Sequence, residues 1–245
     1  YYSIIDKKKF QLEQKIIKLT NKKVISGLYE GIHLNCKTNN GSYDFSTKLL
    51  GIYEEQIQIA LSKLKIENQL DYIVNFGTAD GYHLIGLLKK NLFKYGFSFE
   101  IDKKMNNNLL ENIKLNNLEE KIKLFTTKAD LDFIDTILDE RQLKNTLFLI
   151  DIEGDEFNLF TDGNIEKYKN SYFVIEDHHF YVKDQKKKDF FYKLINKNFK
   201  VNMINTGSRN PYNYKILDNF NDDEKWLMMS EGRPMTMNWI LLSPI

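Results

Sequence analysis

The chain has 245 residues, a formal net charge of +1 and a single cysteine, Cys36. This length allows a mid-sized domain with a large buried core, and the balanced charge gives no overall field that would favour nucleic acid or an anionic membrane. One cysteine excludes an intrachain disulfide and a cysteine-based metal site. No apolar run approaches the roughly 18 residues of a membrane span and no secretory signal pattern is present, so we expect a cytoplasmic protein without a membrane span.

The first 70 residues are expected to form a helical cap. Apolar residues at helical spacing predict one helix over about 8–20 and another over about 52–65. Residues 26–47 are rich in Gly, Asn, Ser and Thr and are expected to form a loop. We therefore divide the chain into a cap, 1–70, and an α/β domain, 71–245.

The α/β domain opens with a strand that stops at a glycine turn. The apolar run Tyr72–Phe76 leads into Gly77-Thr-Ala-Asp-Gly81, and apolar residues at helical spacing follow. Strand, tight turn and helix in this order begin a nucleotide-binding sheet, where glycines let the backbone approach a ligand closely. The spacing Gly77-x-x-x-Gly81 differs from the Gly-x-Gly-x-x-Gly of dinucleotide sites. It suits a ligand without phosphates at this position, and S-adenosylmethionine (SAM) is the obvious candidate.

The second strand of the domain, Phe97–Asp102, ends in acidic residues. Glu100 lies 23 residues after Gly77. An acid about 20 residues beyond the glycine turn hydrogen-bonds the ribose hydroxyls in such folds. Glu100 is therefore the first candidate for binding the ribose, and Asp102 is the alternative.

Further elements follow at the spacing of an alternating α/β fold. A helical stretch at 109–115 precedes a strand at 121–126, after which the carboxylate of Asp130 can meet the adenine amino group. The remaining strands are expected near 146–151, 172–177, 199–205 and 237–242. This alternation predicts a mostly parallel sheet with right-handed crossovers. No long helical pattern separates the last two strands, so they are expected to form an antiparallel hairpin.

Within residues 71–180, four segments resemble the FkbM-type group of class I SAM-dependent methyltransferases. They are Asn75–Tyr82, Phe99–Asp102, Glu111–Asn117 and Leu149–Glu156. The last matches the Asp-x-Glu-Gly-x-Glu signature of that group and is the most specific. The resemblance implies a Rossmann-like class I methyltransferase fold, with a seven-stranded, mostly parallel sheet and an antiparallel C-terminal strand. It also implies SAM-dependent O-methylation of a sugar hydroxyl, in a nucleotide sugar or a surface-polysaccharide precursor.

The same resemblance places a cofactor site on this sequence. Its residues are Asn75, Gly77, Ala79, Gly81, Tyr82, Glu100, Ile101, Ala129, Asp130 and Asp151. Asn75 departs from the pattern, because most class I enzymes carry an acid there, near the amino group of the methionine. A neutral amide still accepts a hydrogen bond, but its attraction for the amino group is weaker.

Polar residues crowd the ends of two neighbouring strands, where open α/β sheets bind ligands. The candidate catalytic residues are His178, Asp151 and His179, because an imidazole beside carboxylates can accept the proton of a hydroxyl. Alternatively, oxygens of Asp151, Glu176 and Asp177 can hold a hard cation such as magnesium. Adjacent strand residues face opposite sides, so the pattern leaves open which histidine points into the pocket.

Candidate acceptor-binding residues come from several segments. They are Tyr53, Glu54, Glu153, Glu176, Asp177 and Arg233. Arg233 can bind a phosphate or carboxylate bidentately or form a surface salt bridge, and the sequence does not decide between these roles.

Two other functions remain open. An N-methyltransferase for protein or nucleic acid is disfavoured, because the chain lacks the Asn/Asp-Pro-Pro-aromatic tetrapeptide and a basic stripe. A non-catalytic SAM-fold scaffold is disfavoured by the intact glycine turn and acid. The expected partner is a small-molecule or nucleotide-sugar substrate, with no nucleic acid.

Overall fold

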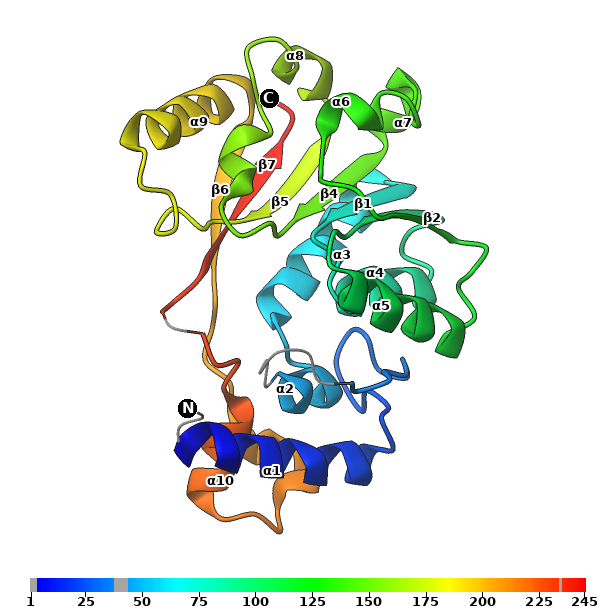
Figure 1. Cartoon of the computed structure of the whole chain (residues 1–245), viewed down its shortest axis with the longest axis vertical. Coiled ribbons are helices and arrows are strands. Elements are labelled where there is room, and N and C mark those ends of the chain that lie inside the picture. Colours follow the sequence, from blue (N-terminus) through cyan, green and yellow to red (C-terminus); the bar gives the residue numbers. More distant parts are fainter. Residues whose placement is uncertain (1–3, 38–43, 234) are drawn as a thin grey trace.

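A seven-stranded sheet forms the centre of the molecule (Figure 1). The computed structural model describes residues 4–37, 44–233 and 235–245. The strands are β1 (Tyr72–Phe76), β2 (Tyr95–Phe99), β3 (Ile122–Phe125), β4 (Thr146–Ile150), β5 (Tyr172–Glu176), β6 (Lys200–Asn205) and β7 (Asn238–Ser243), in the spatial order β3-β2-β1-β4-β5-β7-β6. Strands β1 to β5 run parallel, and β7 runs antiparallel to both neighbours. The predicted seven-stranded, mostly parallel sheet with an antiparallel C-terminal strand is confirmed.

Each face of the sheet has its own hydrophobic core. Side chains alternate along β1, so that Ile73 packs on one face while Val74 and Phe76 pack on the other. Burial on both faces explains why the central strands read as continuous apolar runs. The covering helices are α3 (Glu55–Asn68), α4 (Tyr82–Lys89), α5 (Lys103–Leu115), α6 (Leu131–Ile134), α7 (Glu140–Lys144), α8 (Ile165–Tyr168) and α9 (Gln185–Asn198), with a 3₁₀ turn, η1 (Asp155–Asn158).

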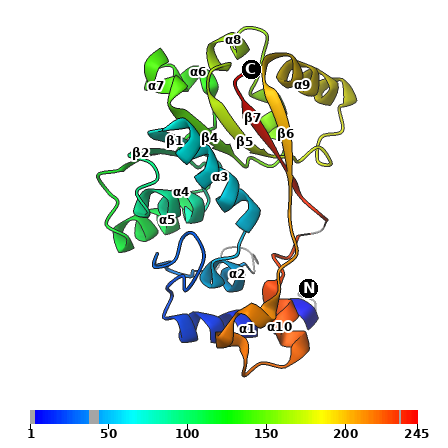
Figure 2. The ribbon, with the colours of Figure 1, turned by 180° about the vertical axis from the view of Figure 1, so that it is seen from behind.

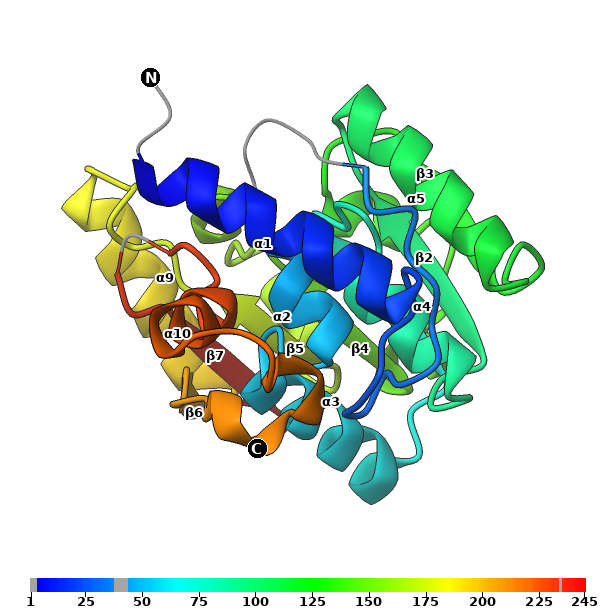
Figure 3. The same ribbon diagram turned by 90° about the horizontal axis from the view of Figure 1, so that it is seen from below.

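A separate helical layer lies below the sheet in Figure 1. It consists of α1 (Ile4–Thr20), α2 (Phe45–Leu50) and α10 (Asp222–Met229), and α1 packs against both other helices. Seen from below, α1 runs across this layer, with α2 partly behind it and α10 to one side (Figure 3). None of the helices in the described part of the chain has both the length and the apolar character needed to cross a bilayer.

Two parts of this layer were not expected from the sequence. Within the predicted loop 26–47, residues 45–47 begin α2, and residues 38–43 lie outside the described part of the chain. All six residues of α2 are buried, and so short a buried helix shows no periodicity that could be read.

The connection between the last two strands is the second correction. The strands pair as the expected antiparallel hairpin, but α10 and two short 3₁₀ helices, η2 (Pro211–Asn213) and η3 (Lys215–Leu217), lie between them in sequence. From behind, β6 and β7 run down together toward α10 (Figure 2). The strand pair therefore carries the helix that contacts α1.

Glu13 on α1 is a buried acid in the helical layer. Its side chain is fully buried, with the backbone N–H groups of Phe45 and Ser46, at the start of α2, as its nearest donors. Burial, together with the nearby charge of Asp44, raises the pKa of Glu13 to about 7. Because this pKa lies above the unfolded value, the folded protein should lose stability as the pH rises from about 4.5 to 7.

Glu13→Gln should remove this loss. We expect the variant to exceed the parent in unfolding free energy by on the order of 3 kcal/mol at pH 8, and by less at pH 5. Urea unfolding at both pH values measures the effect, with Glu30→Gln on the exposed surface as the control. Equal pH dependence in parent and variant would show that Glu13 does not carry it.

Candidate active site

The glycine turn joins β1 to α4 in a left-handed backbone conformation. Gly77 has φ +75° and Gly81 has φ +85°, and Ala79 between them has φ +48°. A β-carbon on Gly77 would lie 1.7 Å from the backbone oxygen of Asp151, at the end of the neighbouring strand. The sequence predicted a close approach of this backbone to a ligand, and the structure shows a close approach to the end of the protein's own β4. Glycine is therefore required for the two strand ends to meet.

Glu100 ties this turn to the end of β2. One of its carboxylate oxygens accepts the N–H of Ala79 at 2.9 Å and the other accepts the N–H of Asp102 at 2.8 Å. Asp102 instead caps α5, accepting the N–H of Lys104 at 2.7 Å. Ile101, between the two acids, is exposed. Glu100, and not Asp102, therefore faces the glycine turn.

A small cavity of about 50 Å³ lies beside the turn. Asn75 and Tyr82 line it, and both side chains are buried. The side-chain amide of Asn75 donates to the carbonyl of Leu149 at 3.2 Å, which fixes its orientation. Tyr82 is part of an aromatic cluster with Tyr29 and Tyr53.

The cavity also contains buried charges that the sequence analysis did not single out. The ammonium of Lys48, on α2, lies 2.9 Å from Asp44 and 2.7 Å from Asp80 in the glycine turn. Burial would lower the pKa of Lys48, but these two carboxylates outweigh it and hold the pKa well above its usual value. In sequence, Lys48 is one of 32 lysines, and nothing distinguished it from a solvated residue.

His83 and Glu54 form a second buried pair in the cavity. The Nε2 atom of His83 lies 2.7 Å from a Glu54 oxygen, and its Nδ1 lies 3.1 Å from the hydroxyl of Tyr29. Burial alone would raise the pKa of Glu54, but His83 and then Arg233 outweigh it and lower this pKa. Glu54 is thus an ionised acid beneath the turn.

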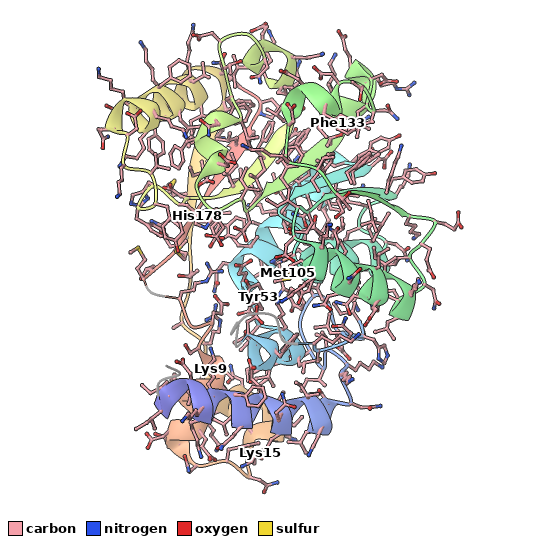
Figure 4. All side chains as sticks on the ribbon, viewed as in Figure 1. Lys9, Lys15, Tyr53, Met105, Phe133 and His178 are labelled. Carbon is pink, nitrogen blue, oxygen red and sulfur yellow. The ribbon has the colours of Figure 1, made fainter. Side chains whose placement is uncertain are left out.

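A larger cleft of about 640 Å³ separates the sheet edge from the helical layer. Lys9 on α1, Tyr53 and His178 line it from different sides, and Figure 4 shows them arranged in this way. Tyr53 and Asp151 also line the small cavity. The two cavities therefore meet at these two residues, at the carboxyl ends of the central strands.

His178 is the buried imidazole of this cleft. It is 3 % exposed, and its Nε2 lies 3.5 to 3.7 Å from oxygens of Asp151, Glu153 and Glu176. Its Nδ1 lies 3.3 Å from a buried oxygen of Glu156, without a hydrogen bond. Burial lowers the pKa of His178, but the carboxylates, Glu156 first, outweigh burial and raise this pKa above its usual value.

Asp151 and Glu176 are both held in a state that favours protonation. The cleft desolvates Asp151 and Glu176 faces it, so the pKa of Asp151 lies well above its usual value. Burial and the charge of Glu54 raise the pKa of Glu176, against the opposing effect of Arg233.

Asp177 and His179 point away from the cleft, which corrects two site assignments. Asp177 is buried and accepts a hydrogen bond from the hydroxyl of Tyr192 at 2.9 Å, and His179 is exposed with its Nδ1 3.3 Å from Asp177. Neither residue lines the cleft. Of the proposed cation ligands, Asp151 and Glu176 both lie beside His178, but Asp177 does not join them, because neighbouring residues at the strand end face opposite sides.

Arg233 is an internal ion-pair partner. Its three guanidinium nitrogens contact the carboxylates of Glu54, Glu176 and Glu231, and Nε lies 2.8 Å from Glu231. Glu231 also pairs with Arg209. Arg233 also lines the large cleft, so a substrate anion there would compete with these carboxylates for its guanidinium.

A third cavity, of about 490 Å³, lies beyond the ends of β3 and β4. Ala129, Asp130 and Ile152 are among its lining residues. Asp130 is exposed and caps α6, accepting the N–H of Asp132 at 2.9 Å. The predicted cofactor residues thus lie along the carboxyl ends of the strands, from the glycine turn to this third cavity.

Comparisons with known proteins establish the fold of this chain, but they do not assign it to a family. No family model matches the chain, and no curated protein matches it. A proposed O-methyltransferase from Klebsiella pneumoniae has a similar structure, with a TM-score of 0.51 and 10 % identity over 96 % of this chain and 90 % of that one. A proposed tRNA methyltransferase from Streptococcus pneumoniae gives 0.50 and 10 % over 78 % and 70 %. These similarities identify the class I SAM-dependent methyltransferase fold.

Proposed function

We propose that the chain is an FkbM-type SAM-dependent methyltransferase that methylates a sugar hydroxyl. The observation that carries the proposal is that the cavity at the glycine turn and the large cleft meet at Tyr53 and Asp151. A sulfonium held at the turn would face an acceptor lying in the cleft. Methyl transfer requires such in-line alignment of donor and acceptor.

The cofactor would lie along the carboxyl ends of the first four strands. Its amino-acid end would occupy the small cavity near Asn75, its ribose would reach Glu100, and its adenine would lie beside Ile101 toward Asp130. Each Glu100 oxygen already accepts one backbone N–H and keeps a further lone pair for a hydroxyl.

Glu100→Ala should weaken SAM binding roughly ten- to hundredfold, because a charge-assisted hydrogen bond contributes about 1.5–3 kcal/mol. Calorimetric titration measures the change, after unfolding curves have shown that the variant folds. Glu119→Ala, on the exposed surface, is the control. Unchanged affinity in a folded Glu100→Ala protein would remove Glu100 from the cofactor site.

His178 would accept the proton of the acceptor hydroxyl. SAM would supply the methyl group and leave as S-adenosylhomocysteine, with the electron pair of the broken bond on sulfur, while Nε2 of His178 would take the proton that the hydroxyl loses. Glu156 behind Nδ1 would stabilise the resulting imidazolium.

The charge of the cleft selects among acceptors. Six carboxylates line it, from Asp6, Asp44, Asp151, Glu153, Glu176 and Glu231, against the cations of Lys9 and Arg233. A nucleotide sugar would bring phosphates into this acidic surface, and nucleic acid would bring more. The exposed ring of Tyr181, stacked on His178, offers an apolar face to a sugar ring. We therefore favour a neutral or amine-bearing sugar over a nucleotide sugar.

A divalent cation is the second candidate for handling the proton. Asp151, Glu153 and His178 each offer one ligand atom, and these atoms lie within 4.8 Å of one another. Because one of the three ligands is an imidazole, this set suits manganese or zinc better than magnesium, which prefers oxygen ligands. A bound ion would lower the pKa of a coordinated hydroxyl.

We propose that residues 1–70 cap the site together with α10. Ile5, Asp6 and Lys9 of α1 line the large cleft, as do Leu227 and Ser230 from α10 and its end. Such a cap would exclude water from the acceptor.

One assay tests the proposal as a whole. SAM turnover is measured with neutral sugars, amino sugars and nucleotide sugars, with and without chelator. We expect turnover with the first two classes in the presence of chelator. Turnover with nucleotide sugars alone would overturn the charge argument, and turnover with protein or nucleic acid alone would overturn O-methylation. Absence of SAM binding would favour the scaffold.

A further inference from the structure

Trp239 on β7 carries a buried indole N–H without a partner. The side chain is 1 % exposed, and within the described residues its Nε1 makes no hydrogen bond. Buried N–H groups are almost always paired, and leaving one unpaired costs about 1–3 kcal/mol. We therefore expect a bound molecule to supply a hydrogen-bond acceptor for this N–H group.

The indole of Trp239 lies at the small cavity beside the glycine turn. Trp239 lines it together with Asn75, Gly77 and Lys48. Its volume of about 50 Å³ has room for one small polar group, such as a carboxylate, but not for a nucleoside. The cavity therefore fits one end of a longer ligand.

The charges of the cavity match an amino-acid end. Lys48 and the Trp239 N–H supply donors, while Asp80 and Glu54 supply buried carboxylate oxygens. Lys48 contacts two carboxylates and, having three N–H groups, can donate one more hydrogen bond. A zwitterion has both an anionic and a cationic group to satisfy these partners.

We propose that the indole N–H of Trp239, with Lys48, binds the α-carboxylate of the amino-acid end of the cofactor. This inference rests on the proposed function, since it assumes that SAM or its demethylated product occupies the turn. It also accounts for Asn75: the cofactor ammonium would be attracted by Asp80 and Glu54, so an acid on β1 is not needed.

The first experiment uses the indole as its own reporter. The chain has two tryptophans, and Trp226 is exposed on α10, so the Trp226→Phe protein emits from Trp239 alone. S-adenosylhomocysteine, which carries the carboxylate, should shift the emission of Trp239. Methylthioadenosine, which lacks the amino-acid part, should bind and leave the emission unchanged. Equal shifts with both ligands would overturn the proposal.

The second experiment removes the N–H. Trp239→Phe should weaken S-adenosylhomocysteine binding roughly tenfold or more and methylthioadenosine binding less than twofold, as measured by calorimetry. Equal losses for both ligands would show that Trp239 only supports the fold, and no loss would show that its N–H binds water only. Either result overturns this assignment while cofactor binding by the parent still supports the proposed function. A parent that binds neither ligand would refute both.

Discussion

His178→Ala should lower kcat by about 10²–10⁴ while SAM affinity changes little, which is the signature of a lost general base. The imidazole is buried and lines the large cleft, with Nε2 3.7 Å from Asp151, which lines both cavities, and Nδ1 3.3 Å from Glu156. Because its pKa lies above the usual value, the parent's rate should rise with pH through a pKa above 6.5. The variant should lose that rise.

The matched control is His179→Ala, one residue along the chain. His179 is exposed and does not line the cleft, so its removal should change kcat less than about threefold. The opposite ranking would transfer the role to His179. If both substitutions had small and equal effects and chelator abolished activity, activation of the acceptor hydroxyl would be assigned to a cation bound at Asp151 and Glu153.

The sheet could be predicted from the sequence because its signals are local. Each central strand is an apolar run ending in a glycine or an acid, and burial on both faces makes such runs continuous. In the helical layer, α1 coincides with the helix predicted over about 8–20, but the other two helices could not be predicted in the same way. The segments α2 and α10 are six and eight residues long, too short for periodicity to outweigh their polar composition.

The candidate site could be predicted in its residue types but not in its pairings. Glu54, Glu176 and Glu231 converge on Arg233 from three segments far apart in the chain, and no local pattern indicates such a contact. The alternation of β5 continues beyond Glu176, since Glu176 and His178 line the cleft while Asp177 and His179 do not. The sequence shows this alternation but not which of its two faces is turned toward the cleft. Lys48 and Trp239 were missed as cavity residues because no local pattern indicates their contacts either.

Gly77→Ala should lose both stability and cofactor binding. The left-handed backbone at this position costs an alanine about 1–2 kcal/mol, before any clash. The added β-carbon would also lie 1.7 Å from the backbone oxygen of Asp151, an atom that cannot rotate away as a side chain would. The end of β4 would have to move.

That movement would disturb the whole site, because Asp151 lines both cavities. We therefore expect an unfolding free energy lower by at least 2 kcal/mol and no measurable S-adenosylhomocysteine binding, by denaturant titration and calorimetry. Gly163→Ala is the control, since its β-carbon would meet only the Thr161 hydroxyl at 3.6 Å. A Gly77→Ala protein with parental stability and affinity would refute the tight contact between the glycine turn and β4. The larger Gly77→Val should be worse for the same reason: the obstacle nearest the added side chain is the strand that carries Asp151, before any cofactor is bound.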